Sequence, residues 1–257
     1  MNIRFTLTGA MKVLVLAGVL FLDSAYAAEK PVVKSKVGSH YVLIKPDTTK
    51  MLPACQDIQD RLFDFLINEK TASEPKGRLF ALKLSKKYGC EYEPIKLSDD
   101  NVHISLLPIA TSADVDASTL VETLKDRLNA EREIVPGGFR LDKVEAFLPA
   151  VGPQNRIFIV IRTPSITDRG FFKLSNAISE GIGIKPQIAQ FKAHASLATL
   201  TKTNGVFTQQ ECDALNGILE EFTDRLNESE ILGQQIDVEE ILFSEFKGKK
   251  HNIFTVQ

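Results

Sequence analysis

The sequence carries one four-residue motif twice, His-x-Ser-Leu, and this duplication limits the folds that the chain can adopt. The first copy supplies His103 and Ser105, and the second supplies His194 and Ser196. Apolar or small residues flank both pairs with a period of two, which predicts strands whose histidine and serine side chains share one face. The chain has four histidines, so half of them lie in this setting. A single short motif has a high false-positive risk, whereas two copies in matching context indicate a shared function.

The elements predicted around the motifs occur in the same order in both halves: strand, helix, motif strand, helix and closing strand. The spacing of apolar positions predicts strands over residues 40–45, 103–109, 139–148, 156–161, 191–200, 235–243 and 251–256. Helices are expected over residues 51–69, 114–133 and 168–179. A fourth helix is expected to start at Thr208, which forms the pattern of a capping box with Glu211. The segment 71–100 contains a turn and stays unassigned.

This internal repeat predicts the fold class. Two copies of one supersecondary unit each bury an apolar face against a neighbour. We therefore expect an α+β fold of two pseudo-symmetric lobes, each an antiparallel sheet backed by helices, with the active-site groove between them. The two motif strands would face one another across this groove, so that the two histidine-serine pairs converge.

The paired motifs contain the groups that phosphodiester cleavage needs. One imidazole can be neutral and accept a proton while the other is protonated and donates one, because imidazole titrates near neutral pH. We therefore expect His103 and His194 to be catalytic, with the choice of acid and base left open. Ser105 and Ser196 are expected to bind the phosphate by donating hydrogen bonds as its charge develops. This scheme requires no metal and no cofactor.

The motifs, their separation and the order of the elements around them resemble the two-histidine (2H) phosphoesterase superfamily, which includes bacterial 2'-5' RNA ligase-like cyclic phosphodiesterases. The resemblance covers residues 41–256. It implies acid-base work by the two motif histidines, phosphate binding by the two serines, and substrates with 2',3'-cyclic phosphates or 2'-5' linkages in RNA or oligoadenylate. The chain departs from many relatives in carrying an export signal, and its 71–100 segment is longer than the counterpart before the second motif. Both departures concern the substrate rather than the type of reaction.

The N-terminus has the pattern of a secretory signal peptide. Two basic residues, Arg4 and Lys12, precede an apolar run at residues 13–22, which is too short to span a bilayer. The small residues Ala25 and Ala27 suit cleavage after Ala27. We expect residues 1–27 to be removed and residues 28–257 to form one bilobal domain. The mature protein is then expected to be secreted or periplasmic, without stable membrane association.

Composition limits the partners. A formal net charge of −2, with no long basic block, argues against an electrostatic clamp on long nucleic acid. We expect a nucleotide or short RNA as substrate and a monomeric protein. Cys55, Cys90 and Cys212 allow at most one internal disulfide, match no metal-ligand spacing, and are expected to be small buried side chains.

Two alternatives stay open. Either motif histidine taken alone could be a buried structural residue, and His40 and His251 lack the motif and are expected at the surface or at strand ends. The alternative function is a secreted nucleotide- or protein-binding module without turnover, because a fold does not fix a function.

Overall fold

The computed structural model describes residues 40–66, 90–109, 117–149, 154–163, 165–181, 193–245 and 249–256. The expected signal peptide (residues 1–27) and residues 71–89 lie outside these ranges. The described strands are β1 (His40–Pro46), β2 (Cys90–Pro94), β3 (Ile104–Ile109), β4 (Gly138–Arg140), β5 (Lys143–Phe147), β6 (Arg156–Arg162), β7 (His194–Lys202), β8 (Gln235–Glu245) and β9 (Lys250–Thr255). The described helices are α2 (Thr48–Leu66), α4 (Ala117–Ala130), α5 (Ser165–Gly181) and α6 (Gln209–Glu228), with a 3-10 turn at Arg132–Ile134.

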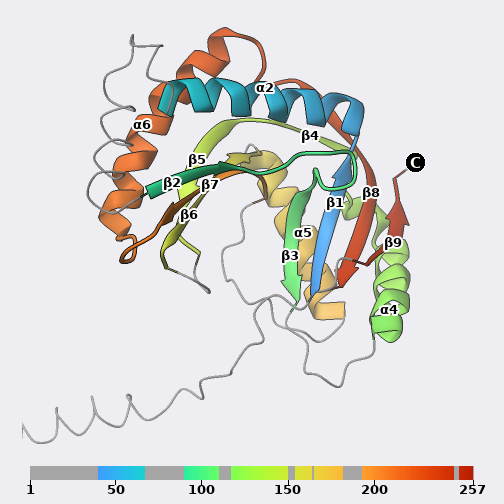
Figure 1. Cartoon of the computed structure of the whole chain (residues 1–257). Coiled ribbons are helices and arrows are strands. Elements are labelled where there is room, and N and C mark those ends of the chain that lie inside the picture. Colours follow the sequence, from blue (N-terminus) through green and yellow to red (C-terminus); the bar gives the residue numbers. More distant parts are fainter. Residues whose placement is uncertain are drawn as a thin grey trace, which may run out of the picture. The chain divides into compact units, whose positions relative to one another are not determined.

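The described strands form one bent sheet that makes two lobes. Along the sheet the order is β4-β8-β1-β3-β7-β6-β5, with β2 added to β7 and β9 added to β8. Each of these pairings is antiparallel. Figure 1 shows β1, β3 and β8 standing together in one lobe and β5, β6 and β7 in the other, with β3 and β7 meeting between them. The predicted α+β fold is therefore confirmed.

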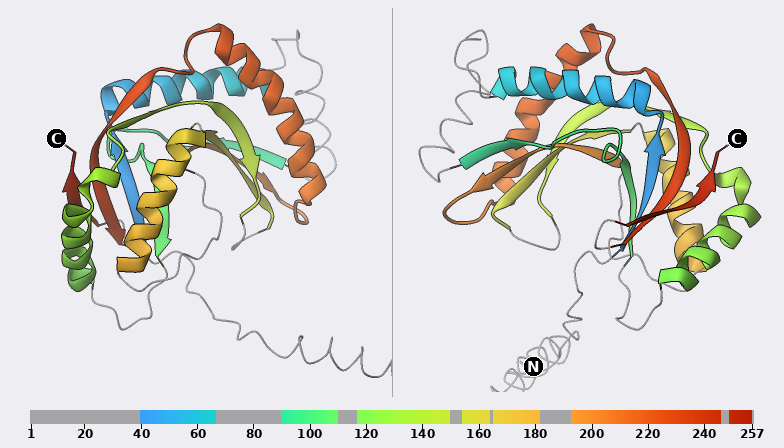
Figure 2. Two further views of the ribbon diagram at one scale, coloured as in Figure 1. Left: turned by 180° about the vertical axis from the view of Figure 1, so that it is seen from behind. Right: turned by 45° about the vertical axis from the view of Figure 1, so that its right-hand side comes forward.

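Helices cover the outer face of each lobe. Helices α2 and α6 pack on the lobe of β5, β6 and β7, whereas α4 packs on β9 and α5 on β3 in the other lobe (Figures 1 and 2). On strand β6, Ile157, Ile159 and Ile161 lie at alternate positions and are fully buried. These side chains share the face of the sheet that packs against the helices. The opposite face of the sheet therefore carries the residues at the even positions of this strand.

The closing strand of each half pairs in the lobe of the other half. Strand β5 belongs to the first half of the chain but pairs with β6, and β8 belongs to the second half but pairs with β1. The two halves are thus interlocked, and neither half of the sequence can complete a lobe by itself.

This exchange corrects the strand predicted over residues 139–148. The structure divides it into β4, which pairs with β8, and β5, which pairs with β6. The backbone leaves one lobe for the other at Leu141 and Asp142, where no strand is formed. The buried positions change accordingly from Phe139 and Leu141 to Val144 and Ala146, so that a shift in the alternation marks the break.

Other local predictions agree with the structure. The capping box of α6 is confirmed, because the Glu211 N–H donates to Thr208 Oγ1 (3.2 Å) and the Thr208 N–H donates to Glu211 Oε2 (2.9 Å). Cys55 and Cys212 are buried thiols, and Cys90 is a half-buried thiol on β2, a strand that we did not predict. Of the helices in the described ranges, none combines the length and apolar character that a membrane span requires.

Candidate functional site

The two motif strands are direct neighbours at the seam between the lobes. Ser105 on β3 lies opposite His194 on β7, and His194 lies opposite Arg162 on β6. Residues directly opposite each other on antiparallel strands project from the same face, with Cβ atoms about 4.5–5.5 Å apart. The serine of the first motif, the histidine of the second and Arg162 therefore share one face of the sheet. We call the face that carries these three residues the motif face.

The other two motif residues follow from this register. His103 precedes Ser105 by two positions, and Ser196 follows His194 by two, so both continue on the motif face. Because β3 and β7 are antiparallel, moving from Ser105 back to His103 and moving from His194 on to Ser196 lead toward the same end of the sheet. His194 thus lies opposite Ser105, and His103, just before the start of β3, lies at the end of this strand that is nearer to Ser196. All four side chains are half-buried, as expected for groups that line a surface site.

The ring of His103 is fixed by a hydrogen bond from its Nδ1 to the backbone carbonyl of Asn101 (2.6 Å). A carbonyl oxygen only accepts, so Nδ1 carries the proton and the neutral ring presents the lone pair of Nε2. Burial lowers the pKa of His103 from its ordinary value of 6.5; the Asn101 hydrogen bond opposes this and the nearby charge of Lys250 adds to it. His103 is therefore suited to accept a proton at Nε2.

The turn that supplies this carbonyl is itself held in place. Asn101 accepts a hydrogen bond at Oδ1 from the Ser98 N–H (2.7 Å) and donates from Nδ2 to the Lys96 carbonyl. Lys250 on β9 donates to the Asp100 carbonyl in the same turn. Sequence reasoning missed Asn101 and Lys250, although an asparagine two positions before a motif histidine is a usable signal for a turn.

The surroundings of His194 differ from those of His103. Its ring contacts Phe147 on β5 edge to face, with centroids 5.3 Å apart and an interplanar angle of 68°. Phe147 in turn stacks on Phe158 of β6 at 5.5 Å and 18°. Neither phenylalanine was identified from the sequence, because this contact reaches across β6 and depends on the bend of the sheet.

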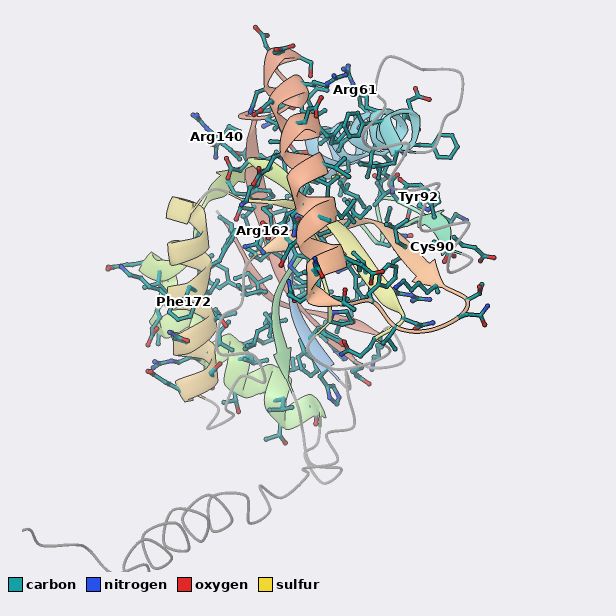
Figure 3. The ribbon with its side chains drawn as sticks, turned by 90° about the vertical axis from the view of Figure 1, so that its left-hand side faces the viewer. Arg61, Cys90, Tyr92, Arg140, Arg162 and Phe172 are labelled. Atoms are coloured by element: carbon teal, nitrogen blue, oxygen red, sulfur yellow. The ribbon has the colours of Figure 1, made fainter. Side chains whose placement is uncertain are left out.

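An ion pair lies beside the second motif. Arg162 is buried, and its Nε lies 3.0 Å from Glu145 Oε1, while Lys143 Nζ lies 3.1 Å from Glu145 Oε2. Figure 3 shows Arg162 in the interior of the molecule, whereas Arg140 and Phe172 project outward. The motif face thus carries a fixed positive group next to His194, within a network that balances its charge.

The remaining histidines have their own partners away from the motif residues. His40 starts β1 and stacks on Phe243 with centroids 5.3 Å apart, and His251 on β9 lies 2.6 Å from Glu245. Within the described ranges, no group of three or more His, Cys, Asp or Glu residues is arranged to hold a metal ion.

The fold that carries the paired motifs is also found among solved structures. No protein-family model and no curated protein sequence matches the chain. One similar structure is that of Usb1 from Kluyveromyces marxianus with uridine monophosphate. The two folds match with a TM-score of 0.54 and 10% sequence identity, over 84% of this chain and 98% of that chain.

Two further structures are similar. A second structure of K. marxianus Usb1 matches with a TM-score of 0.54 and 13% identity, over 87% of this chain and 99% of that chain. LigT from Escherichia coli complexed with 3'-AMP matches with a TM-score of 0.36 and 15% identity, over 86% and 97%. At such identities the Usb1 structures show a shared fold, and the chemistry has to be argued from the residues of this chain.

Proposed function

We propose that this protein is an exported, metal-independent phosphodiesterase acting on 2',3'-cyclic phosphate or 2'-5' phosphodiester bonds in a nucleotide or short RNA. The observation that carries the proposal is the pairing of Ser105 with His194, which sets a hydroxyl of one motif beside the imidazole of the other. The shared fold with Usb1, whose structure contains uridine monophosphate, supports a nucleotide ligand.

The environments of the two histidines support a division of roles. His103 Nε2 accepts a proton from water as the water oxygen attacks phosphorus. The bond from phosphorus to the leaving ribose oxygen breaks, and His194 gives that oxygen its proton. Ser105 and Ser196 donate hydrogen bonds to the non-bridging oxygens, whose charge grows in the transition state. A phosphomonoester and a free hydroxyl result, with His103 protonated and His194 neutral, and proton exchange with water restores both rings.

The proposed substrate is short because the sequence has no long basic block of the kind that binding to long nucleic acid favours. The formal net charge is −2, and Arg162, the basic residue beside His194, is already paired with Glu145. Export rests on the N-terminal sequence pattern. We propose that the mature protein acts as a monomer in the periplasm or outside the cell.

A substrate panel tests this proposal. Purified mature protein is incubated with EDTA and a nucleoside 2',3'-cyclic phosphate, a 2'-5' oligoadenylate or a 3'-5' cyclic dinucleotide, and the products are separated by chromatography. We expect metal-independent turnover of one of the first two substrates. Binding of these ligands without turnover, in the presence or absence of added divalent metal ions, would instead establish the binding module.

A further inference from the structure

We infer that Phe147 is a positioning residue, which holds the His194 imidazole in the orientation needed to pass its proton to the leaving oxygen. This inference rests on the proposed function, because it gives His194 the role of acid. Phe147 is the last residue of β5, and its ring contacts the imidazole ring of His194.

The contact between Phe147 and His194 is not a consequence of simple strand pairing. Phe147 lies opposite Phe158 on β6, whereas His194 lies opposite Arg162, near the other end of the same strand. The two rings therefore meet diagonally across β6, from different register positions of this strand. The bend of the sheet thus brings Phe147 to the histidine of the second motif.

The stack with Phe158 makes Phe147 a rigid support. The two phenylalanine rings lie nearly parallel, so Phe158 covers one face of Phe147 and limits its rotation. An edge-to-face aromatic pair contributes about 0.5–1.5 kcal/mol beyond the burial of its area. An interaction of this size favours one ring orientation of His194 over the alternatives, and proton transfer requires the donor nitrogen within about 3 Å of the oxygen that receives the proton.

The same geometry argues against Phe147 as a platform for a nucleobase. A base stacks on an open ring face, but Phe158 covers one face of Phe147, and the contact with His194 occupies another side of the ring. A base could stack only on the face of Phe147 that Phe158 leaves uncovered. The contacts of Phe147 with Phe158 and His194 therefore favour a residue that acts by positioning His194.

Three variants test the inference. We expect Phe147→Leu to lower kcat about 10- to 100-fold with KM changed less than about 3-fold, because small errors in the position of a catalytic group cost up to roughly 100-fold. Phe147→Tyr keeps the ring and should restore kcat to within about 3-fold of the wild-type value. Phe63→Leu is the matched control: it makes the same change at a ring on α2 that packs against Tyr92, and should keep kcat within about 2-fold.

A spectroscopic measurement separates this inference from the proposed function. In ¹H–¹⁵N spectra of the substrate-free protein with labelled histidine, the ring signals of His194 should shift and broaden in Phe147→Leu, and return in Phe147→Tyr. This measurement needs no turnover, so it tests the contact even if the substrate panel fails. A Phe147→Leu variant that raises KM and keeps kcat would overturn the inference in favour of a base platform. Equal losses of kcat in Phe147→Leu and Phe63→Leu would overturn it in favour of a general effect of losing an aromatic ring.

Discussion

Asn216 on α6 closes the edge of the sheet at β5, the strand that brings Phe147 to the site. The Ala146 N–H donates to Asn216 Oδ1 (2.7 Å), and Asn216 Nδ2 donates to the Ala146 carbonyl (3.0 Å). One side-chain amide thus makes the pair of hydrogen bonds that a neighbouring strand would make. Thr223, also on α6, binds the same edge two residues earlier on β5, where its Oγ1 accepts a hydrogen bond from the Val144 N–H (3.1 Å).

Replacing Asn216 by leucine keeps a side chain of similar size and removes both hydrogen bonds. A hydrogen bond contributes about 0.5–1.5 kcal/mol net, and a buried backbone group left without its partner costs about 1–3 kcal/mol. The hydrogen bonds between Ala146 and Asn216 are only partly buried, so we expect the free energy of unfolding to fall by about 2–4 kcal/mol. For a domain of this size, about 2–4 °C per kcal/mol corresponds to a decrease in Tm of roughly 4–16 °C.

Urea unfolding followed by circular dichroism measures this change, with Tm as a second readout. Glu220→Gln is the matched control, because Glu220 is exposed on the same helix one turn later. We expect the control to stay within about 0.5 kcal/mol of the wild type. An Asn216→Leu variant as stable as the control would show that the amide does not stabilise this edge.

Four further predictions concern proton transfer, the pH dependence of stability, helix stability and processing. Burial lowers the pKa of His103, so the acid limb of the pH profile of kcat/KM should lie below 6.5. Lys250→Met should move this limb to higher pH, because it removes a nearby positive charge that lowers the pKa. A wild-type limb above 6.5 would contradict the role of His103 as the base. The same lowered pKa means that the unfolded state binds more protons, so stability should decrease as pH falls from about 6.5 through the pKa of the folded protein. A Cβ at Gly217 in α6 meets nothing within 4 Å, so Gly217→Ala should raise the free energy of unfolding by about 0.5–1 kcal/mol, and a loss of stability in urea refutes this. N-terminal sequencing of exported protein should begin at Ala28 or within a few residues of it, and an intact Met1 contradicts cleavage.

The sequence predicts those parts of the fold that depend on local pattern. Alternation over the two motif strands, the apolar spacing of the helices and the capping box of Thr208 all depend on residues close in the chain. The duplication adds the one long-range relation that can be derived, namely that His103 and His194 belong to equivalent positions of two related units. These features suffice to predict the fold class, and they bring the four motif residues to neighbouring positions on β3 and β7, while the roles of these residues stay a prediction.

The remaining features depend on contacts that no local pattern specifies. Both parts of the strand predicted over residues 139–148 alternate, and the change of phase between them does not reveal their partners, so only the pairing with β8 and β6 shows that the chain crosses between lobes. Strand β2 exists as an addition to the edge of β7, a partner far along the chain. Phe147 reaches His194 because the sheet bends, and Asn101 acts through its backbone carbonyl, which any residue could offer.

Separate and combined removal of the two motif histidines tests the central claim most directly. His103→Ala and His194→Ala should each lower kcat by about 10²- to 10⁴-fold, the usual effect of losing a general acid or base. The double variant should be hardly worse than the poorer single variant, because groups that act on one transition state are strongly non-additive. His251→Ala, which removes a histidine outside the site, should keep wild-type activity. A folded His103→Ala or His194→Ala variant with full activity, or a double variant whose loss is the product of the two single losses, would contradict a shared acid-base site.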